Sequence, residues 1–205
     1  VTSIGGVAFG YCSELTSITI PDSVTSIGYS AFQSCSSLTS VAIGNGVTSI
    51  GDNAFSNCSS LTNITVNTGN TKYHSSGNCI IETSAKTLIA GCSSSVIPSD
   101  GSVTSIRNSA FSGCSNLTSI QIPSNVTSIG DSAFNGCKGL MSIVIPDNVT
   151  NIGDYAFYGC IGLSSVVIGN SVASIGDSAF YHCSGLTSII IPDSVTSIGN
   201  WVFAH

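Results

Sequence analysis

The sequence predicts a mostly β solenoid of the α/β repeat type, in which the chain winds into coils of nearly equal length. A 23-residue repeat covers almost all of the 205 residues, and apolar side chains recur at fixed positions within it. Only 7% of the residues are charged, whereas 42% are hydrophobic, so the regular apolar positions can form a core. Repeats of this length cannot bury an apolar face alone and are typical of stacked coils.

The segment Val-Thr-Ser-Ile-Gly marks the start of each unit. It or a close variant begins at Val1, Val24, Val47, Val103, Val126, Val149, Val172 and Val195. Adjacent starts are 23 residues apart, except that 56 residues separate Val47 from Val103. We therefore expect a single solenoid over residues 1–205 with about nine coils. Because the pattern is already running at the first residue, we also expect the chain to be a fragment of a longer protein.

Each unit contains a strand followed by a turn and a second short extended segment. In the first unit, Ile18 and Ile20 share one face of the strand through its two-residue alternation, and Leu15 enters the core just before it. Pro21 and Asp22 are residues that commonly form turns. The second extended segment begins at the next Val-Thr-Ser-Ile.

A short helix is expected after the second extended segment. Aspartate recurs there at Asp52, Asp131, Asp154 and Asp177, a residue type that suits the N-cap of a helix. Ala31, Phe32 and Cys35 would then place their side chains inward from that helix.

The unit Val-Thr-Ser-Ile-Gly-Asp-Ser-Ala-Phe-x-x-Cys-x-x-Leu-Thr-Ser-Ile-x-Ile-Pro resembles the BspA-type leucine-rich repeat, found in bacterial and protozoan surface proteins. The motifs Ala-Phe-x-x-Cys and Leu-Thr-Ser-Ile-x-Ile-Pro carry the resemblance, which covers essentially the whole chain. It implies a right-handed solenoid with a concave parallel sheet and with short strands and helical turns on the convex side. It also implies an extracellular or cell-surface location and a role in adhesion.

Residues 70–102 break the repeat register. Residues 78–83 and 86–90 predict the two strands of a β-hairpin around Ser84 and Ala85, and in that register Cys79 faces Ala90. Residues 95–98 then resemble a shortened repeat strand. This irregular coil is either a variant coil in which a hairpin replaces the convex half or a functional protrusion. Lys72, His74 and Lys86 lie within it.

Seven of the nine cysteines occupy one repeat position and are expected to form an inward ladder of free thiols, because free cysteine packs as a small hydrophobic residue. They are Cys12, Cys35, Cys58, Cys114, Cys137, Cys160 and Cys183. Zinc ligands require close pairs such as Cys-x-x-Cys, and the sequence contains none. The expected hairpin register also argues against a Cys79–Cys92 disulfide.

We expect no catalytic site, cofactor or metal. His182 next to Cys183 suggests a nucleophilic pair, but adjacent residues rarely face each other and Cys183 belongs to the thiol ladder. Asp131, Asp154 and Asp177 stand 23 residues apart, which leaves calcium binding and helix capping as alternatives, of which capping requires no metal. His182 and His205 share a repeat position that we expect on the surface.

The charge balance excludes some classes of partner. The net charge is −6, and the strong cations are Lys72, Lys86, Arg107 and Lys138. Four scattered cations cannot follow a phosphate backbone, so we expect no nucleic-acid partner. No segment approaches the roughly 18 apolar residues of a membrane span, so we expect no membrane insertion.

The outward strand positions form the candidate ligand-binding surface on the concave face. They are Thr19, Ala42, Thr65, Gln121, Met141, Val144, Val167 and Ile190. The series is rich in hydroxyl groups at its start and apolar at its end. The apolar end indicates an interface. The alternative is that β-branched residues occur at these positions only because they favour strands. A convex aromatic set, Tyr155, Tyr158, Tyr181 and Trp201, is either a second interface or a group of rings covered between coils.

The sequence therefore predicts a non-enzymatic, adhesin-like module that binds a protein or host-surface ligand through the concave sheet. The alternative is a structural spacer that presents another domain of a longer protein. The oligomeric state is left open.

Overall fold

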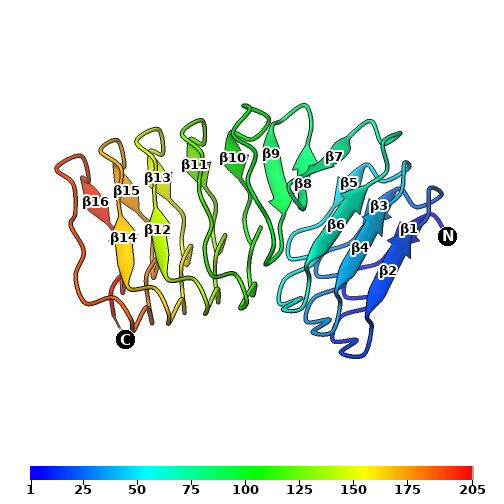
Figure 1. Ribbon diagram of the computed structural model, residues 1–205, viewed down its shortest axis with the longest axis horizontal. Helices are drawn as coiled ribbons and strands as arrows, with labels where there is room; N and C mark the ends of the chain where they lie inside the picture. Colours follow the sequence, from blue (N-terminus) through cyan, green and yellow to red (C-terminus); the bar gives the residue numbers. More distant parts are fainter. Residues whose placement is uncertain (205) are drawn as a thin grey trace.

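The computed structural model of the protein describes residues 1–204 and shows coils stacked side by side along the molecule (Figure 1). His205, expected on the surface, lies outside the described residues. Each regular coil carries up to two strands, one of three or four residues and one of two. The longer strands are β2 (Ser17–Ile20), β4 (Ser40–Ile43), β6 (Asn63–Val66), β12 (Ser142–Val144) and β14 (Ser165–Val167). We call the surface that they and the equivalent residues of the other coils form the long-strand face.

The two-residue strands form the short-strand face. They are β1 (Ser3–Ile4), β3 (Ser26–Ile27), β5 (Ser49–Ile50), β10 (Ser105–Ile106), β11 (Ser128–Ile129), β13 (Asn151–Ile152), β15 (Ser174–Ile175) and β16 (Ser197–Ile198). Neighbouring strands of regular coils pair in parallel with partners 23 residues apart, as Ile18 pairs with Val41. The mostly β solenoid of stacked parallel strands is thus confirmed.

The core lies between the two faces, and one phenylalanine from each regular coil fills it. Neighbouring rings stack nearly parallel, with centroids 5.0 Å apart for Phe111 and Phe134 and 5.5 Å apart for Phe32 and Phe55. In the inner coils, the alanine before the phenylalanine and the isoleucine of the short strand are also buried, whereas Ile4 and Ile198 in the end coils are not. The repeat thus places the same side chain against its own copy in the next coil. The buried side chains form two hydrophobic clusters, which meet at the irregular coil.

The expectation of a helix after each short strand is wrong, because residues 1–204 contain turns there and no helix. Ser30 (φ 52°) and Ser34 (φ 60°) have left-handed backbone conformations, which interrupt a helix every fourth residue. The N–H of Phe32 instead donates to the carbonyl of Ala54 in the next coil at 2.8 Å. These turns therefore link coils, and we call the surface they form the turn edge.

The left-handed conformation recurs at two repeat positions. The first comprises Val7, Ser30, Asn53, Ser109, Ser132, Tyr155, Ser178 and Trp201, and the second comprises Tyr11, Ser34, Asn57, Gly113, Gly136, Gly159 and His182.

Residues 70–102 contain β7 (Tyr73–Ser76), β8 (Cys79–Glu82) and β9 (Thr87–Ala90). β8 and β9 are antiparallel, as expected, but Ile80 and not Cys79 faces Ala90, because the register shifts between Ile80 and Ile81. β7, which the sequence did not predict, pairs antiparallel with β8. β9 pairs in parallel with β10, so it takes the place of a short strand.

The irregular coil is incomplete on the other two sides of the solenoid. On the turn edge, the N–H of Asn57 donates directly to the carbonyl of Ser112 at 2.8 Å. On the long-strand face, the sheet β2–β4–β6 and the pair β12–β14 are separated by coils without a strand there (Figure 1). The coil therefore extends the short-strand sheet of the C-terminal half, which remains separate from the sheet β1–β3–β5, and it lies where the long-strand face is interrupted.

Candidate binding site on the long-strand face

The structure places the candidate ligand-binding residues outward on the long-strand face. Thr19, Thr65 and Gln121 are exposed and Ala42 is half-buried. In the C-terminal half, Met141 and Val144 are each 58% exposed, Val167 is 54% exposed and Ile190 is 84% exposed. Apolar side chains are usually shielded from water in a stable protein. A group of four that are each more than half exposed therefore needs an explanation.

We call four of these side chains the apolar row: Met141, Val144, Val167 and Ile190. Val144, Val167 and Ile190 occupy the same position in successive coils, and Met141 precedes Val144 by three residues in one coil. Val144 and Val167 are direct partners in the parallel pair of β12 and β14. Ile190 follows Val167 by one repeat, and adjacent coils in a sheet lie about 4.8 Å apart. Their neighbours Ile143 and Val166 point inward and are buried. The row is therefore an exposed surface supported by a rigid core.

A hollow of about 450 Å³ lies where the long-strand face is interrupted. Its lining residues include Val96, Ile120 and Gln121. Val96 is 69% exposed and was absent from the predicted site. The signal for it was present, because Val96 precedes Ile97-Pro98 just as the outward residue precedes Ile-Pro in a regular unit.

The repeated cysteines point into the core. Cys12, in the first coil, is exposed and the other eight cysteines are buried, all nine as free thiols. The thiol of Cys58 donates to the carbonyl of Phe32 at 3.1 Å, and that of Cys183 donates to Phe157 at 3.2 Å. The thiol thus adds a second hydrogen bond to a carbonyl that already accepts a cysteine N–H within its own coil, as the carbonyl of Phe32 accepts the N–H of Cys35.

Burial makes these thiols poor nucleophiles. It raises the pKa of Cys58 to about 12 and the pKa of Cys183 to about 11. A thiol needs its thiolate form to attack a substrate, so these groups are unreactive near neutral pH. His182 is exposed and its ring contacts Tyr181 edge-on at 4.4 Å, while the Cys183 thiol points to Phe157. The two residues do not form a catalytic pair.

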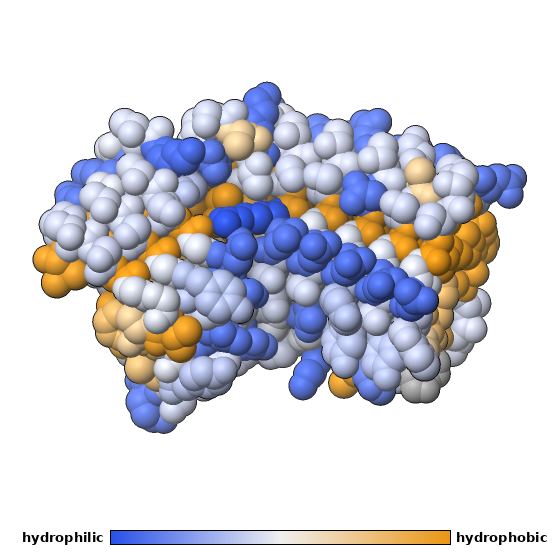
Figure 2. All heavy atoms as spheres, turned by 180° about the vertical axis from the view of Figure 1, so that it is seen from behind, coloured by the Kyte–Doolittle hydropathy of each residue, from blue (hydrophilic) through white to orange (hydrophobic). Residues whose placement is uncertain are grey.

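The recurring aspartates form a ladder and not helix caps, because no helix follows them. Oδ1 of Asp131 accepts the N–H of Asp154 at 3.0 Å, and Oδ1 of Asp154 accepts the N–H of Asp177 at 2.7 Å. Asn108 and Asn200 continue the ladder at its two ends. Figure 2 shows a row of hydrophilic residues beside a hydrophobic stripe along the C-terminal half of this side.

Neither a metal centre nor a membrane-spanning helix is found in residues 1–204. No three histidine, cysteine, aspartate or glutamate residues there are grouped so that they could hold a metal ion. No helix in this range is long and apolar enough to cross a membrane.

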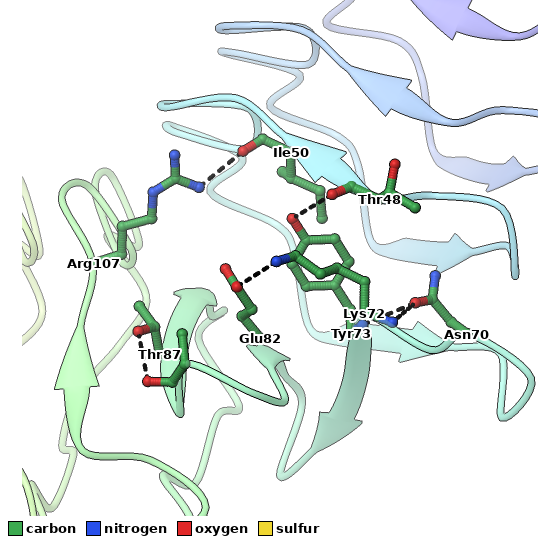
Figure 3. Close-up of polar contacts among 9 residues, drawn as sticks. Thr48, Ile50, Asn70, Lys72, Tyr73, Glu82, Thr87 and Arg107 are labelled. Carbon is green, nitrogen blue, oxygen red and sulfur yellow. Dashed lines mark hydrogen bonds and ion pairs between the residues drawn. The ribbon is translucent and has the colours of Figure 1, made fainter.

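The junction between β5 and the irregular coil is closed by side chains. In regular coils, a glycine N–H donates to the carbonyl of the isoleucine one coil before, as Gly51 does to Ile27 at 2.8 Å. The carbonyl of Ile50 instead accepts Nη1 of Arg107 at 2.8 Å (Figure 3). Nη2 of Arg107 forms an ion pair with Asp52 at 2.6 Å.

Two residues of the insertion donate to two further carbonyls of this edge. Nδ2 of Asn70 donates to the carbonyl of Val47 at 3.0 Å, and the hydroxyl of Tyr73 donates to the carbonyl of Thr48 at 3.5 Å. Lys72 and Glu82 form an ion pair at 2.6 Å beside them (Figure 3). The Tyr73 hydroxyl therefore replaces a backbone N–H, because in regular coils the N–H of Thr48 donates to the carbonyl of Thr25. The valine carbonyl accepts a side chain in regular coils as well, as that of Val172 does from Ser194.

Stacked 23-residue coils with a Leu-x-x-Ile-x-Ile strand, a phenylalanine stack and a cysteine ladder define a leucine-rich repeat solenoid. The BspA-type leucine-rich repeat region matches residues 1–99 and 86–205 in 6 copies. The chain belongs to this family, as its sequence predicted.

Solved structures of bacterial leucine-rich repeat proteins are similar to it. A leucine-rich cell-surface protein from Faecalibacterium prausnitzii is 33% identical, with a TM-score of 0.65 over 98% of this chain and 57% of that protein. A leucine-rich repeat protein from T. pallidum is 27% identical, with a TM-score of 0.53 over 92% of this chain and 72% of that protein. A leucine-rich repeat protein from Eubacterium ventriosum is 21% identical, with a TM-score of 0.62 over 99% of this chain and 80% of that protein. At this identity the likeness shows the fold alone. A search of curated proteins found no match.

Proposed function

We propose that this chain is a protein-binding module of a bacterial surface protein and that its partner docks on the apolar row. The related Faecalibacterium protein is described as a cell-surface protein, which supports an extracellular location. The chain spans 57% of that protein's length, so the proposal concerns these coils. The proposed role is binding without catalysis. The binding surface is the long-strand face, which we take to be the concave side of the solenoid because the family resemblance implies a concave parallel sheet.

The exposure of the apolar row is the observation that carries the proposal. Met141, Val144, Val167 and Ile190 are each more than half exposed on coils that are otherwise regular. Contiguous exposed apolar side chains of this kind usually mark an interface. The equivalent positions at the other end, Thr19 and Thr65, carry hydroxyl groups, although threonine favours strands as valine does. Strand propensity alone therefore does not account for the difference between the two ends.

The experiment compares binding of the purified chain to a panel of purified extracellular-matrix and host cell-surface proteins. The test variant carries Val144→Asp, Val167→Asp and Ile190→Asp, which place charges at the centre of the proposed interface. The matched control carries Thr19→Asp and Thr65→Asp on the same face. Because a buried aspartate must lose its hydration without a partner, we expect the test variant to bind at least about 100-fold more weakly.

The outcomes are distinct. Binding that the test variant loses and the control retains supports the site. Equal binding by both variants contradicts it. If wild type binds no protein of the panel, the proposed function is contradicted and the chain is better regarded as a spacer. Thermal unfolding of each variant verifies that it is folded.

A further inference from the structure

An aromatic hollow lies on the turn edge of the C-terminal half, away from the apolar row. Its volume is about 310 Å³, and Tyr158, Ser178, Tyr181 and Trp201 line it. The rings of Tyr158 and Tyr181 are stacked, with centroids 5.2 Å apart and planes 9° from parallel. Trp201 is 72% exposed. Three aromatic groups therefore line one shallow depression that is open to solvent.

The repeat explains why a hollow exists here. Tyr155, Ser178 and Trp201 occupy the same repeat position, and all three have a left-handed φ of 54–57°. The small Ser178 lies between two large side chains and is only 8% exposed. Two coil spacings of about 4.8 Å separate Tyr155 from Trp201, which leaves space above Ser178.

The surroundings of the hollow are negatively charged. Asp154 immediately precedes Tyr155, and Asp177 immediately precedes Ser178. Asp147 and Asp193, the other aspartates of residues 139–204, follow prolines at the turns after the long-strand segments, and the preceding cation in the sequence is Lys138. Each ladder aspartate uses Oδ1 for the N–H of the next coil, as Asp177 does for Asn200. Its negative charge is not neutralised by any ion pair in the described residues.

We propose that this hollow binds an organic ammonium cation, such as a trimethylammonium group. The faces of tyrosine and tryptophan rings attract cations through their quadrupoles, and methylated ammonium groups are weakly hydrated enough to leave water for an aromatic site. The ladder carboxylates next to the hollow in sequence add electrostatic attraction for a cation. A bare metal ion does not fit, because the site offers rings where a metal needs several ligand oxygens.

Trp201 provides the readout, because it is the only tryptophan of the chain. Its fluorescence is followed during titration with choline at constant ionic strength, and separately with the neutral tert-butyl analogue of choline. The two probes have nearly the same shape and differ in charge. We expect a saturable change with choline and at least about tenfold weaker binding of the neutral analogue, since only the cation interacts with the ring quadrupoles.

Three variants test the assigned residues. Tyr181→Leu removes one ring and is expected to weaken choline binding about tenfold, while Tyr181→Phe retains the ring and is expected to retain binding. Asp177→Asn keeps the ladder oxygen but removes the charge, so we expect weaker binding and less dependence on salt. Tyr29→Leu is the matched control, since Tyr29 is an exposed tyrosine (58%) in the N-terminal half.

Several results would overturn the proposal. They are the absence of a saturable change, equal binding of choline and its neutral analogue, and equal binding by Tyr181→Leu and wild type. A simple methyl glycoside that saturates the signal when choline does not would identify a carbohydrate platform instead. Failure of the apolar row to bind a protein leaves this test unaffected, because the two surfaces share no residue.

Discussion

The guanidinium of Arg107 donates to the carbonyl of Ile50 at 2.8 Å across 57 residues of sequence. It is the only arginine of the chain, and it lies where the insertion prevents the next coil from supplying a glycine N–H. One side chain therefore links the coils on the two sides of the irregular segment.

Replacing Arg107 with methionine is expected to lower the free energy of unfolding by about 2 kcal/mol. Most of this loss comes from the unsatisfied carbonyl of Ile50, because such groups cost about 1–3 kcal/mol. The ion pair with Asp52 contributes little, since the Asp52 side chain is 51% exposed. Urea unfolding measures the change. Lys138→Met, on an exposed lysine, is the control, and an equal effect of the two variants would rule out the assigned role.

Gly113 and Gly159 allow backbone strain to be separated from a steric clash. Both have the left-handed φ, at 75° and 68°. An added Cβ at Gly159 meets nothing within 4 Å, whereas at Gly113 it would lie 2.5 Å from the Cα of Asn57. We expect Gly159→Ala to destabilise by about 1 kcal/mol, through left-handed strain alone. Gly113→Ala should cost at least about 1 kcal/mol more, because the junction must also move. Equal losses in denaturant unfolding would show that the coils do not approach closely at Asn57.

The aspartate ladder predicts that the oxygen matters and the charge does not. Asp154→Asn retains an oxygen for the N–H of Asp177, and asparagine already stands in the ladder at Asn108 and Asn200. We expect this variant to be at least as stable as wild type, because it also removes repulsion between stacked carboxylates. Asp154→Ala should lose about 1 kcal/mol.

Calorimetry with and without a calcium chelator completes the test of the ladder. We expect the same melting temperature in both conditions. A melting temperature that falls on chelation, and a matching loss in Asp154→Asn, would restore calcium binding as the role of these residues.

The buried thiols predict a loss of stability in alkaline solution. An unfolded thiol loses its proton near its ordinary pKa of 9.0, whereas burial raises the pKa of Cys58 to about 12. Above pH 9 the unfolded state therefore binds fewer protons than the folded state, and the free energy of unfolding falls as pH rises to about 12. Cys58→Ala should reduce this slope, and Cys12→Ala, which removes the exposed thiol, serves as the control.

Thiol titration checks the same ladder at neutral pH. One of the nine cysteines should react rapidly in the folded protein, because eight are buried, and all nine should react after denaturation. Rapid reaction of several thiols in the folded protein would mean that the ladder is open to solvent. A total below nine would indicate disulfides.

The repeat made the strands, the core and the outward positions predictable from sequence. Once Ile18, Ile20 and Phe32 are recognised as repeated positions, their stacking follows from the 23-residue period. The same alignment could have found Val96, which precedes an Ile-Pro pair.

The turn edge was not predictable in the same way. Serine and tyrosine occupy left-handed positions such as Ser30 and Tyr155, where glycine would have indicated a turn. The aspartate that suits a helix N-cap serves equally well as an acceptor for the next coil, so its residue type did not distinguish the two structures. β7 and the role of Arg107 depend on contacts between distant segments that the repeat period does not encode.

The most direct test of the proposed binding surface uses Met141, the only methionine of the chain, which is 58% exposed. Mass spectrometry follows its oxidation by hydrogen peroxide in the free chain and in the complex with a protein that wild type binds in the panel. Docking on the apolar row predicts that oxidation in the complex is at least about tenfold slower, because the bound protein covers the sulfur. An unchanged rate would show that the partner binds elsewhere.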